Sequence, residues 1–521
     1  MAHRQRHSAI GWLNYCVWIM ALWASLFNLL NFNNYPLLRP EVGLAMIGLA
    51  LVGLCMGHLQ KLSQPRLWAA VTGLFAVLLI DLNTSLTVAW FFGLWVGIGL
   101  IAFYAKELFS HVVFASASAV LLFQATGALW VSDVGDKSPN QVLNLQDERR
   151  PAANRPAIVH LVLDSYLGLD GMALGPNIYR SLRSEQSAFF LGHGFQVYPR
   201  AYSPHSKTLN SLPALFSYGG EQPFIHKVSG SYTIPEQLPY FADLNRLGYR
   251  IEAHIPAYFD LCVKQKLAEC ETFQSSHLSS MLGTELRAVD RAKVFAFTML
   301  NLTHVTRLIV NSIRPDPAAR FAFNRSELFP VTSLRELDKF IDDLPNLRRG
   351  EVRFGHFLLP HDPYMLAADC SVKPESQWLD EHGPGAAAVR EKSYADQVNC
   401  LQQRLEQLFD ALGRSSAGRE AIVLLHGDHG SRIAPSQPMV DGPVLSKREL
   451  LMSYSTFFAI RVPAQAPGEI EGTYALDQLM ADFRARDFLA APRPSAEQSK
   501  VSILGSSGEP LAGGNLPHFI H

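Results

Sequence analysis

The sequence predicts a chain of two parts: an N-terminal α-helical membrane domain of about five spans, and an exported α/β domain with a largely parallel central sheet. Two observations support this fold class. The N-terminal part of the 521-residue chain is strongly apolar and nearly free of charge, as membrane-spanning helices are. The remainder alternates between strand-like and helix-like patterns, which is typical of α/β domains built on parallel strands.

Five apolar segments in the first 131 residues resemble membrane spans. They cover approximately residues 10–30, 42–57, 67–80, 88–105 and 110–131. The first segment has no small-residue cleavage site behind it, so we do not expect a removable signal peptide. We therefore predict a transmembrane domain over residues 1–131 and a polar linker over residues 132–156.

The charges between these segments predict the orientation, because Lys and Arg are retained on the cytoplasmic side of a membrane. Only Arg39 lies on one side of the predicted membrane. The other side carries Arg4, Arg6, Lys61, Arg66 and Lys106. With the N-terminus inside and five spans, the rest of the chain lies outside. The expected location is the bacterial inner (plasma) membrane, as a multi-pass protein with its catalytic domain on the periplasmic or extracellular side.

Residues 157–521 are predicted to form the exported domain. Strand-like runs are AIVHLVLD, YRIEAHI, VRFGHFLL, AIVLLH and STFFAIRV, and helix-like runs are PEQLPYFADLNRLG, residues 391–412 and YALDQLMADFRARD. The apolar segment 294–315 carries His304 and Arg307. We interpret it as a core or interfacial helix, since an arginine within a span is costly.

The cysteines agree with export. Cys262, Cys270, Cys370 and Cys400 lie in the predicted exported domain. An even number of cysteines in an oxidising compartment predicts two disulfides, most simply Cys262 with Cys270 and then Cys370 with Cys400, although the sequence does not fix the pairing. A formal net charge of −1 and the absence of a basic run argue against a nucleic-acid partner.

A polar cluster, HGDHGSR at residues 426–432, follows the apolar run AIVLL. Open α/β sheets bind ligands beyond the carboxyl ends of their strands, so this is a candidate site. Gly427 and Gly430 permit a tight turn that aims both side chains at one point. By itself the stretch is equally compatible with a structural turn, in which Asp428 caps a helix and His429 packs against its surroundings.

Three other stretches also place polar groups where an element begins or ends. Asp164 closes the strand-like run in HLVLDSYLG, Thr208 begins the helix-like run in HSKTLNSLPALFSYG, and His361 follows a strand in GHFLLPHDPY. Each also has a structural interpretation: Asp164 as a loop cap, Thr208 as an N-cap, and His356 and His361 as polar core residues.

Taken together, these side chains form a candidate metal site. Asp164, Asp428 and His429 offer two carboxylates and an imidazole, a set that suits zinc or manganese, and the Thr208 hydroxyl would complete it. A metal lowers the pKa of a bound oxygen, and a helix start favours an alkoxide and a phosphate, so Thr208 is a candidate nucleophile. Two further residues, Lys207 and His361, are candidates to neutralise the non-bridging oxygens of a phosphoryl group.

This order of motifs resembles the alkaline phosphatase superfamily. Within it, five spans before an exported domain resemble the lipoteichoic acid synthases and the lipid A phosphoethanolamine transferases. The run TLNSLPALFSY is similar to the nucleophile segment of the transferases, and SKT resembles the Lys-Thr pair of the synthases. The resemblance implies a sulfatase-like catalytic fold in which Asp164, Thr208, Asp428 and His429 hold the metal and His361 contacts the substrate phosphate.

The chain also departs from these families. Asp164 stands where the phosphoethanolamine transferases usually have Glu, which is closer to sulfatases. The stretch SRIAPSQPMVDGPVLSKREL, after the DHG motif, lacks the additional His of those transferases. The sulfatase activation motif, Cys or Ser followed by x-Pro-x-Arg, is absent around Thr208, so we do not expect sulfate ester hydrolysis.

The leading hypothesis is therefore a transferase that moves phosphoethanolamine or phosphoglycerol from a membrane phospholipid donor to an envelope glycan or lipid acceptor, through a covalent Thr208 intermediate. One alternative is a membrane-bound phosphodiesterase, phosphatase or other sulfatase-like hydrolase, in which water takes the second step. A different class of function is a catalytically silent scaffold for assembly of the cell envelope.

Overall fold

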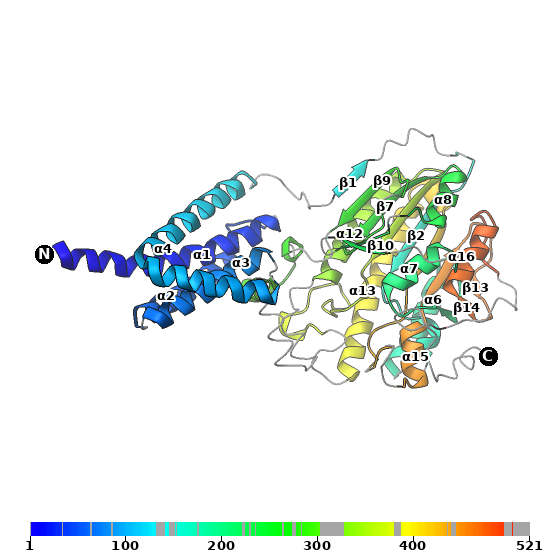
Figure 1. Ribbon diagram of the computed structural model, residues 1–521. Helices are drawn as coiled ribbons and strands as arrows, with labels where there is room; N and C mark the ends of the chain where they lie inside the picture. The colour runs from blue at the N-terminus through cyan, green and yellow to red at the C-terminus, as the bar shows by residue number, and fades with distance from the viewer. Residues whose placement is uncertain are drawn as a thin grey trace. The chain divides into compact units, whose positions relative to one another are not determined.

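The structure is a computed structural model of the chain (Figure 1). It describes residues 2–33, 35–62, 65–84, 87–131, 141–144, 152, 154–173, 177–220, 225–228, 231–234, 236–262, 265–273, 278–282, 284–302, 328–379, 387–434, 436–438, 444–493 and 503. The chain divides into two compact units. The helical unit comprises Met1–Pro139, His277–Glu327 and Pro374–Ser376, and the α/β unit comprises Asn140–Ser276, Leu328–Lys373 and Gln377–His521.

The helical unit begins with four helices that pack against one another. They are α1 (Ala2–Phe32), α2 (Pro40–Leu62), α3 (Pro65–Thr84) and α4 (Val88–Val131). The indole of Trp95 on α4 donates a hydrogen bond to the Ala70 carbonyl on α3 at 2.7 Å. A Cβ at Gly73 would lie 2.8 Å from the Gly99 nitrogen, so glycines permit the close approach of α3 and α4.

The fourth and fifth predicted spans lie on a single helix, the 44-residue α4. Figure 1 shows that α4 bends part-way along its length. Within the described residues one stretch, Pro40–Leu59 on α2, is long and apolar enough to cross a membrane. Three shorter apolar stretches lie on the other helices: Tyr15–Asn31, Arg66–Leu78 and Ala89–Ala105.

The two compact units do not follow chain order, because α9 (Ala288–Leu302) belongs to the helical unit. It packs against α2 and α3, and Arg291 on α9 forms an ion pair with Glu41 on α2. Sequence order hides this placement, since residues on both sides of the segment belong to the α/β unit. Residues 303–315 of the predicted interfacial helix, including His304 and Arg307, lie outside the described residues.

The α/β unit is built on a nine-stranded sheet with the order β1-β9-β7-β10-β2-β11-β12-β3-β13. The five strands from β9 to β11 are all parallel, which confirms the predicted largely parallel sheet. The strands are β1 (Gln141–Asn144), β2 (Ile158–Leu163), β3 (Gln196–Val197), β7 (Arg250–Pro256), β9 (Glu269–Phe273), β10 (Glu351–Phe357), β11 (Ile422–His426), β12 (Phe458–Arg461) and β13 (Gly468–Glu469). Each of the five predicted strand runs matches one of these strands.

One edge of the sheet lies inside the predicted linker. Strand β1 pairs antiparallel with β9, from Gln141 opposite Thr272 to Asn144 opposite Glu269. Pairing with β1 satisfies backbone groups that β9 would otherwise leave open at the edge. The polar composition of residues 132–156 indicates a linker, but backbone pairing of this kind does not require apolar side chains.

Helices cover the sheet on both faces (Figure 1). One layer holds α7 (Thr208–Phe216), α8 (Pro239–Arg246) and α16 (Leu476–Ala485), and the other holds α6 (Asn177–Gly192), α12 (Phe329–Asp343) and α13 (Ala387–Gly413). All six residues of β2 are buried, as expected for a central strand covered on both sides. The runs predicted as helical match α8, α13 and α16.

Shorter elements complete the unit. They are α5 (Leu169–Ala173), α14 (Ser416–Arg419), α15 (Lys447–Tyr454), the pair β4 (Ala201–Tyr202) with β14 (Tyr474–Ala475), and a small sheet of β5 (His226–Val228), β6 (Ser231–Thr233) and β8 (Phe259–Asp260).

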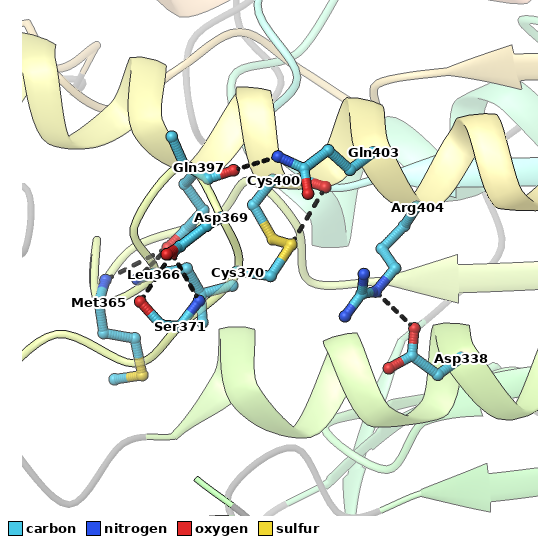
Figure 2. Close-up of a disulfide and its surroundings, with 11 residues drawn as sticks. Asp338, Met365, Leu366, Asp369, Cys370, Ser371, Gln397, Cys400, Gln403 and Arg404 are labelled. Carbon is cyan, nitrogen blue, oxygen red and sulfur yellow. Dashed lines mark hydrogen bonds and ion pairs between the residues drawn. A yellow bond between two sulfur atoms is a disulfide. The ribbon is translucent and has the colours of Figure 1, made fainter. Parts of the chain in front are cut away.

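Both predicted disulfides are confirmed. Cys262 bonds to Cys270, and Cys370 bonds to Cys400 on α13 (Figure 2). The second bond ties the segment that follows β10, which contains His361, to helix α13. Cys16 and Cys55, in the helical unit, are free.

Removing the second disulfide should destabilise the α/β unit. Replacing Cys370 and Cys400 together by Ser should lower its free energy of unfolding by about 2–4 kcal/mol, because the unfolded chain regains the freedom of the closed loop. Denaturant unfolding would measure the change, with Cys16→Ser as a control that leaves it unaltered. Peptide mapping without reduction should recover both linked pairs, and free thiols at all four positions would contradict this account.

Candidate active site

The ends of three neighbouring parallel strands form the candidate site. Asp164 follows β2, His361 lies four residues beyond β10, and Asp428 and His429 follow β11. Because β10, β2 and β11 are adjacent and parallel, their carboxyl ends meet at one edge of the sheet. Thr208, the first residue of α7, approaches the same edge.

Four of the predicted side chains come together there. Ligand atoms of Asp164, Asp428 and His429 all lie within 4.8 Å of one another. The Thr208 hydroxyl donates a hydrogen bond to Asp164 Oδ2 at 3.2 Å and lies 3.3 Å from His429 Nε2. All four residues are buried. The strands and the helix start therefore assemble the predicted ligand set.

The chemistry of this donor set fits a divalent cation. His429 Nδ1 lies 2.7 Å from the Gly430 carbonyl, which can only accept, so Nδ1 carries a proton and Nε2 is the nitrogen that can bind a metal. That nitrogen faces Asp428 Oδ2 at 3.3 Å and Asp164 Oδ1 at 3.8 Å. Asp428 Oδ2 is buried, and no donor among the described residues hydrogen-bonds to it. Lone pairs that converge in this way repel one another unless a cation lies between them, and this set suits zinc or manganese.

Backbone and hydroxyl donors fix the Asp428 side of the cluster. Asp428 Oδ1 accepts a hydrogen bond from the Ser165 backbone at 3.0 Å, and the Asp428 carbonyl accepts one from the Ser211 hydroxyl on α7. Asp428 is thus linked to the turn after β2 and to the helix that begins with Thr208. These contacts hold the two carboxylates and the hydroxyl in a defined arrangement.

Three imidazoles surround Asp164. His356 Nε2 on β10 lies 3.5 Å from Asp164 Oδ2, and His361 Nε2 lies 4.0 Å from Oδ1. Burial by itself would raise the pKa of the Asp164 carboxyl, but His361 and His356 counter burial, and that pKa lies below its usual value. Asp164 is therefore an anion in the folded protein, as a metal ligand must be.

His361 is oriented by its own segment. Its ring nitrogen Nδ1 donates to the Asp362 carbonyl at 2.5 Å, and the His361 carbonyl accepts a hydrogen bond from Gln397 on α13 at 2.7 Å. Burial lowers the pKa of His361, but Asp362 and Asp164 outweigh burial and raise it above its usual value. His361 is thus suited to a cationic role beside the cluster.

Lys207 stands apart from these residues. It is exposed at the position before α7, and no hydrogen bond or ion pair in the described part of the chain ties its amine to the cluster. Contact of Lys207 with a substrate stays a prediction.

The sequence analysis missed a fourth strand end at the site. Tyr258 follows β7, the neighbour of β10, and its hydroxyl shares a hydrogen bond with Thr208. Burial, with Asp164 nearby, raises the pKa of Tyr258. Arg432, at the end of HGDHGSR, carries a cation that acts on both Tyr258 and His361. Applying the strand-end rule to YRIEAHIPAY would have found Tyr258.

A buried hydrogen-bond chain lies beneath the DHG turn. His426 Nδ1 donates to the Gly427 carbonyl at 2.8 Å, so His426 Nε2 is the nitrogen that faces His160 Nε2, at 2.8 Å. Burial lowers the pKa of both imidazoles, that of His426 to about 4, so both are neutral near pH 7. The shared proton then belongs to His160 Nε2, and the Tyr240 hydroxyl donates to His160 Nδ1 at 2.7 Å. This chain fixes the carbonyl that immediately precedes Asp428.

Comparison with known proteins finds similarity only to solved structures. No protein-family model matches the chain, and no curated protein matches it. Similar structures include the C-terminal periplasmic domain of EcEptC from Escherichia coli in complex with Zn, at 12% identity and a TM-score of 0.39, covering 70% of this chain and 90% of that one.

Two other similar structures are hydrolases by name. A putative sulfatase from Bacteroides thetaiotaomicron has 12% identity and a TM-score of 0.39, covering 70% of this chain and 76% of that one. Phosphonate monoester hydrolase of Agrobacterium radiobacter has 12% identity and a TM-score of 0.38, with 69% and 78% covered. Because the TM-scores lie below 0.5, we infer function from this chain's own site.

The buried histidine chain yields a test of how the turn is held. Replacing either His160 or His426 by Leu leaves the other imidazole without its hydrogen-bond partner. Each single variant should lower the free energy of unfolding by about 1–3 kcal/mol. Replacing both by Leu removes the unpaired nitrogens and should recover part of that loss. The double variant should nevertheless bind zinc about 10–100-fold more weakly than the unaltered protein, because the Gly427 carbonyl has lost its hydrogen-bond donor.

Denaturant unfolding and zinc titration against a chelator would measure the two effects separately. Tyr198→Phe is a matched control, because Tyr198 is also buried and its hydroxyl bonds the Pro492 carbonyl instead. A double Leu variant that binds zinc as tightly as the unaltered protein would contradict this role.

Proposed function

We propose that the protein is a metal-dependent transferase that moves phosphoethanolamine or phosphoglycerol from a membrane phospholipid to an envelope glycan or lipid. The observation that carries the proposal is the position of the Thr208 hydroxyl. It begins a helix, it donates to Asp164, and it lies beside His429 within a cluster suited to a cation. A buried hydroxyl in these surroundings is equipped to act as a nucleophile toward phosphorus.

Each neighbouring residue has a distinct part in this chemistry. A zinc or manganese ion held by Asp164, Thr208, Asp428 and His429 would supply the Lewis acidity that favours the alkoxide of Thr208. The backbone N–H groups at the start of α7 favour a phosphate at the same place. His361 supplies positive charge toward the non-bridging oxygens, and Lys207 is a second candidate for this part.

The proposed reaction has two balanced steps. In the first, the Thr208 oxygen bonds to the phosphorus of the donor lipid while the bond from phosphorus to the diacylglycerol oxygen breaks, and the proton of Thr208 ends on the diacylglycerol hydroxyl. In the second, a hydroxyl of the acceptor attacks the phosphothreonine and restores the hydroxyl of Thr208. If water replaced the acceptor, the same site would be a phosphodiesterase.

The proposed setting is the bacterial inner membrane, with five crossings and the site on the periplasmic or extracellular side. Two disulfides in the α/β unit support an oxidising compartment. The basic residues between the apolar helices support an internal N-terminus. A bend in α4 supports counting its two halves as separate crossings. Membrane attachment favours transfer from a lipid, because the donor then lies in the same bilayer.

A catalytically silent scaffold is the less favoured reading. Such a protein would have no need to bury two carboxylates, an imidazole and a threonine hydroxyl with their polar atoms facing one another. The completeness of this arrangement favours an active enzyme.

The proposal predicts a covalent adduct on Thr208. Incubating the purified protein with phosphatidylethanolamine or phosphatidylglycerol, then digesting it for mass spectrometry, should add the mass of the transferred group to the peptide that contains Thr208. Thr208→Ala should lose the adduct and turnover but keep most of its metal, because three ligands remain. Thr208→Ser should retain part of the turnover. An active Thr208→Ala protein would rule out the covalent mechanism.

A further inference from the structure

Helix α9 belongs to the helical unit, although in the sequence it lies between two segments of the α/β unit. The segment His277–Glu327 groups with the N-terminal helices, whereas Ser276 and Leu328 on either side of it belong to the α/β unit. The 15 residues of α9 span about 22 Å at 1.5 Å per residue, which is less than the roughly 30 Å hydrocarbon core of a bilayer. The described residues of α9 are therefore by themselves too few to cross a membrane.

A buried ion pair fastens α9 to the start of α2. Arg291 Nε lies 2.9 Å from Glu41 Oε1, and Arg291 Nη2 donates to Oε2 at 3.3 Å. Glu41 is fully buried, and the Tyr35 hydroxyl donates to its Oε1 at 2.5 Å. A hydrogen bond between a guanidinium and a carboxylate is strengthened by charge, and removing one partner from a buried pair leaves an uncompensated charge.

Other contacts join the same two regions. Asn33 Oδ1 accepts a hydrogen bond from the Leu278 backbone at 3.0 Å, and the Tyr35 ring packs edge-on against Phe295 of α9 at 4.9 Å. Arg291 also donates to the Leu286 carbonyl at 2.6 Å, which holds its guanidinium in place. The connection between α1 and α2 is thus fastened to residues 278–295 through Asn33, Tyr35 and Glu41.

We propose that residues 278–302 are a second membrane anchor, which attaches the exported domain to the outer end of α1 and α2 independently of the connection through α4. From the proposed function the inference takes only that the α/β unit is exported. The anchor also bears on which side of the membrane the loop between α1 and α2 lies. Since α9 is joined at both ends to the α/β unit, the loop between α1 and α2 lies on the same face as that unit, which fits an internal N-terminus and an odd number of crossings.

Cleaving the chain after α4, between the helical unit and β1, tests the anchor directly. A recognition site for a specific protease is inserted between residues 132 and 140, and membranes carrying the full chain are cleaved, washed at high salt and sedimented. The C-terminal fragment of the unaltered protein should stay in the pellet, because α9 still holds it. Arg291→Ala and Glu41→Ala should each lower the pelleted share several-fold.

Two controls separate the anchor from general damage. Arg287, just before α9, is exposed, and in the described part of the chain its ion pair is with Asp290 of α9, so Arg287→Ala should leave the fragment in the pellet. Exchanging the charges, Glu41→Arg with Arg291→Glu, should restore part of the retention that either single variant loses. Variants that misfold would fail in both the single and the exchanged forms.

A disulfide gives a second measurement that does not depend on the ion pair. Asn33→Cys with Leu278→Cys, added to Arg291→Ala, should keep the fragment in the pellet until a reductant releases it. Release of the unaltered fragment on cleavage, or retention of the Arg291→Ala fragment, would overturn the proposal. Retention does not depend on turnover, so a failed Thr208 adduct with normal retention would contradict the proposed function alone.

Discussion

The site depends on one electrostatic constraint: two buried carboxylates and the Nε2 of His429 converge on the same small volume. The Gly430 carbonyl accepts a hydrogen bond from Nδ1 of His429, so Nε2 is the ring nitrogen that faces the acids. Such an arrangement is unfavourable unless positive charge lies between the groups. A divalent cation is the simplest way to supply that charge, and it would account for the placement of Thr208 as well.

The rest of the α/β unit can be understood as support for this cluster. The adjacent parallel strands β10, β2 and β11 bring their carboxyl ends together, and the helix dipole of α7 favours negative charge at Thr208. His356 on β10 and His361 beyond it favour the ionised form of Asp164. The neutral pair His160 and His426 holds the turn from below without adding charge. The histidines beside Asp164 and those beneath the turn thus have separate parts at the same sheet edge.

Much of this could be predicted from the sequence, because strands with continuous apolar runs and polar residues at their ends have a strong local signature. Asp164, Asp428 and His429 were found in this way. Other features depend on contacts between distant residues. Nothing near Arg291 in the sequence points to Glu41, 250 positions away, so the grouping of α9 with the N-terminal helices could not be predicted. Tyr258 sits in a turn whose strand was recognised, but a tyrosine after a strand is a weak signal.

The central claim is that Asp164, Thr208, Asp428 and His429 together bind a divalent metal. X-ray absorption of the full-length protein, at the edge of whichever metal copurifies with it, tests this most directly. The account predicts one metal per chain with oxygen and nitrogen neighbours at about 2.0–2.2 Å and the scattering of a single imidazole. Sulfur neighbours, several imidazoles, or protein that is active without bound metal would contradict it.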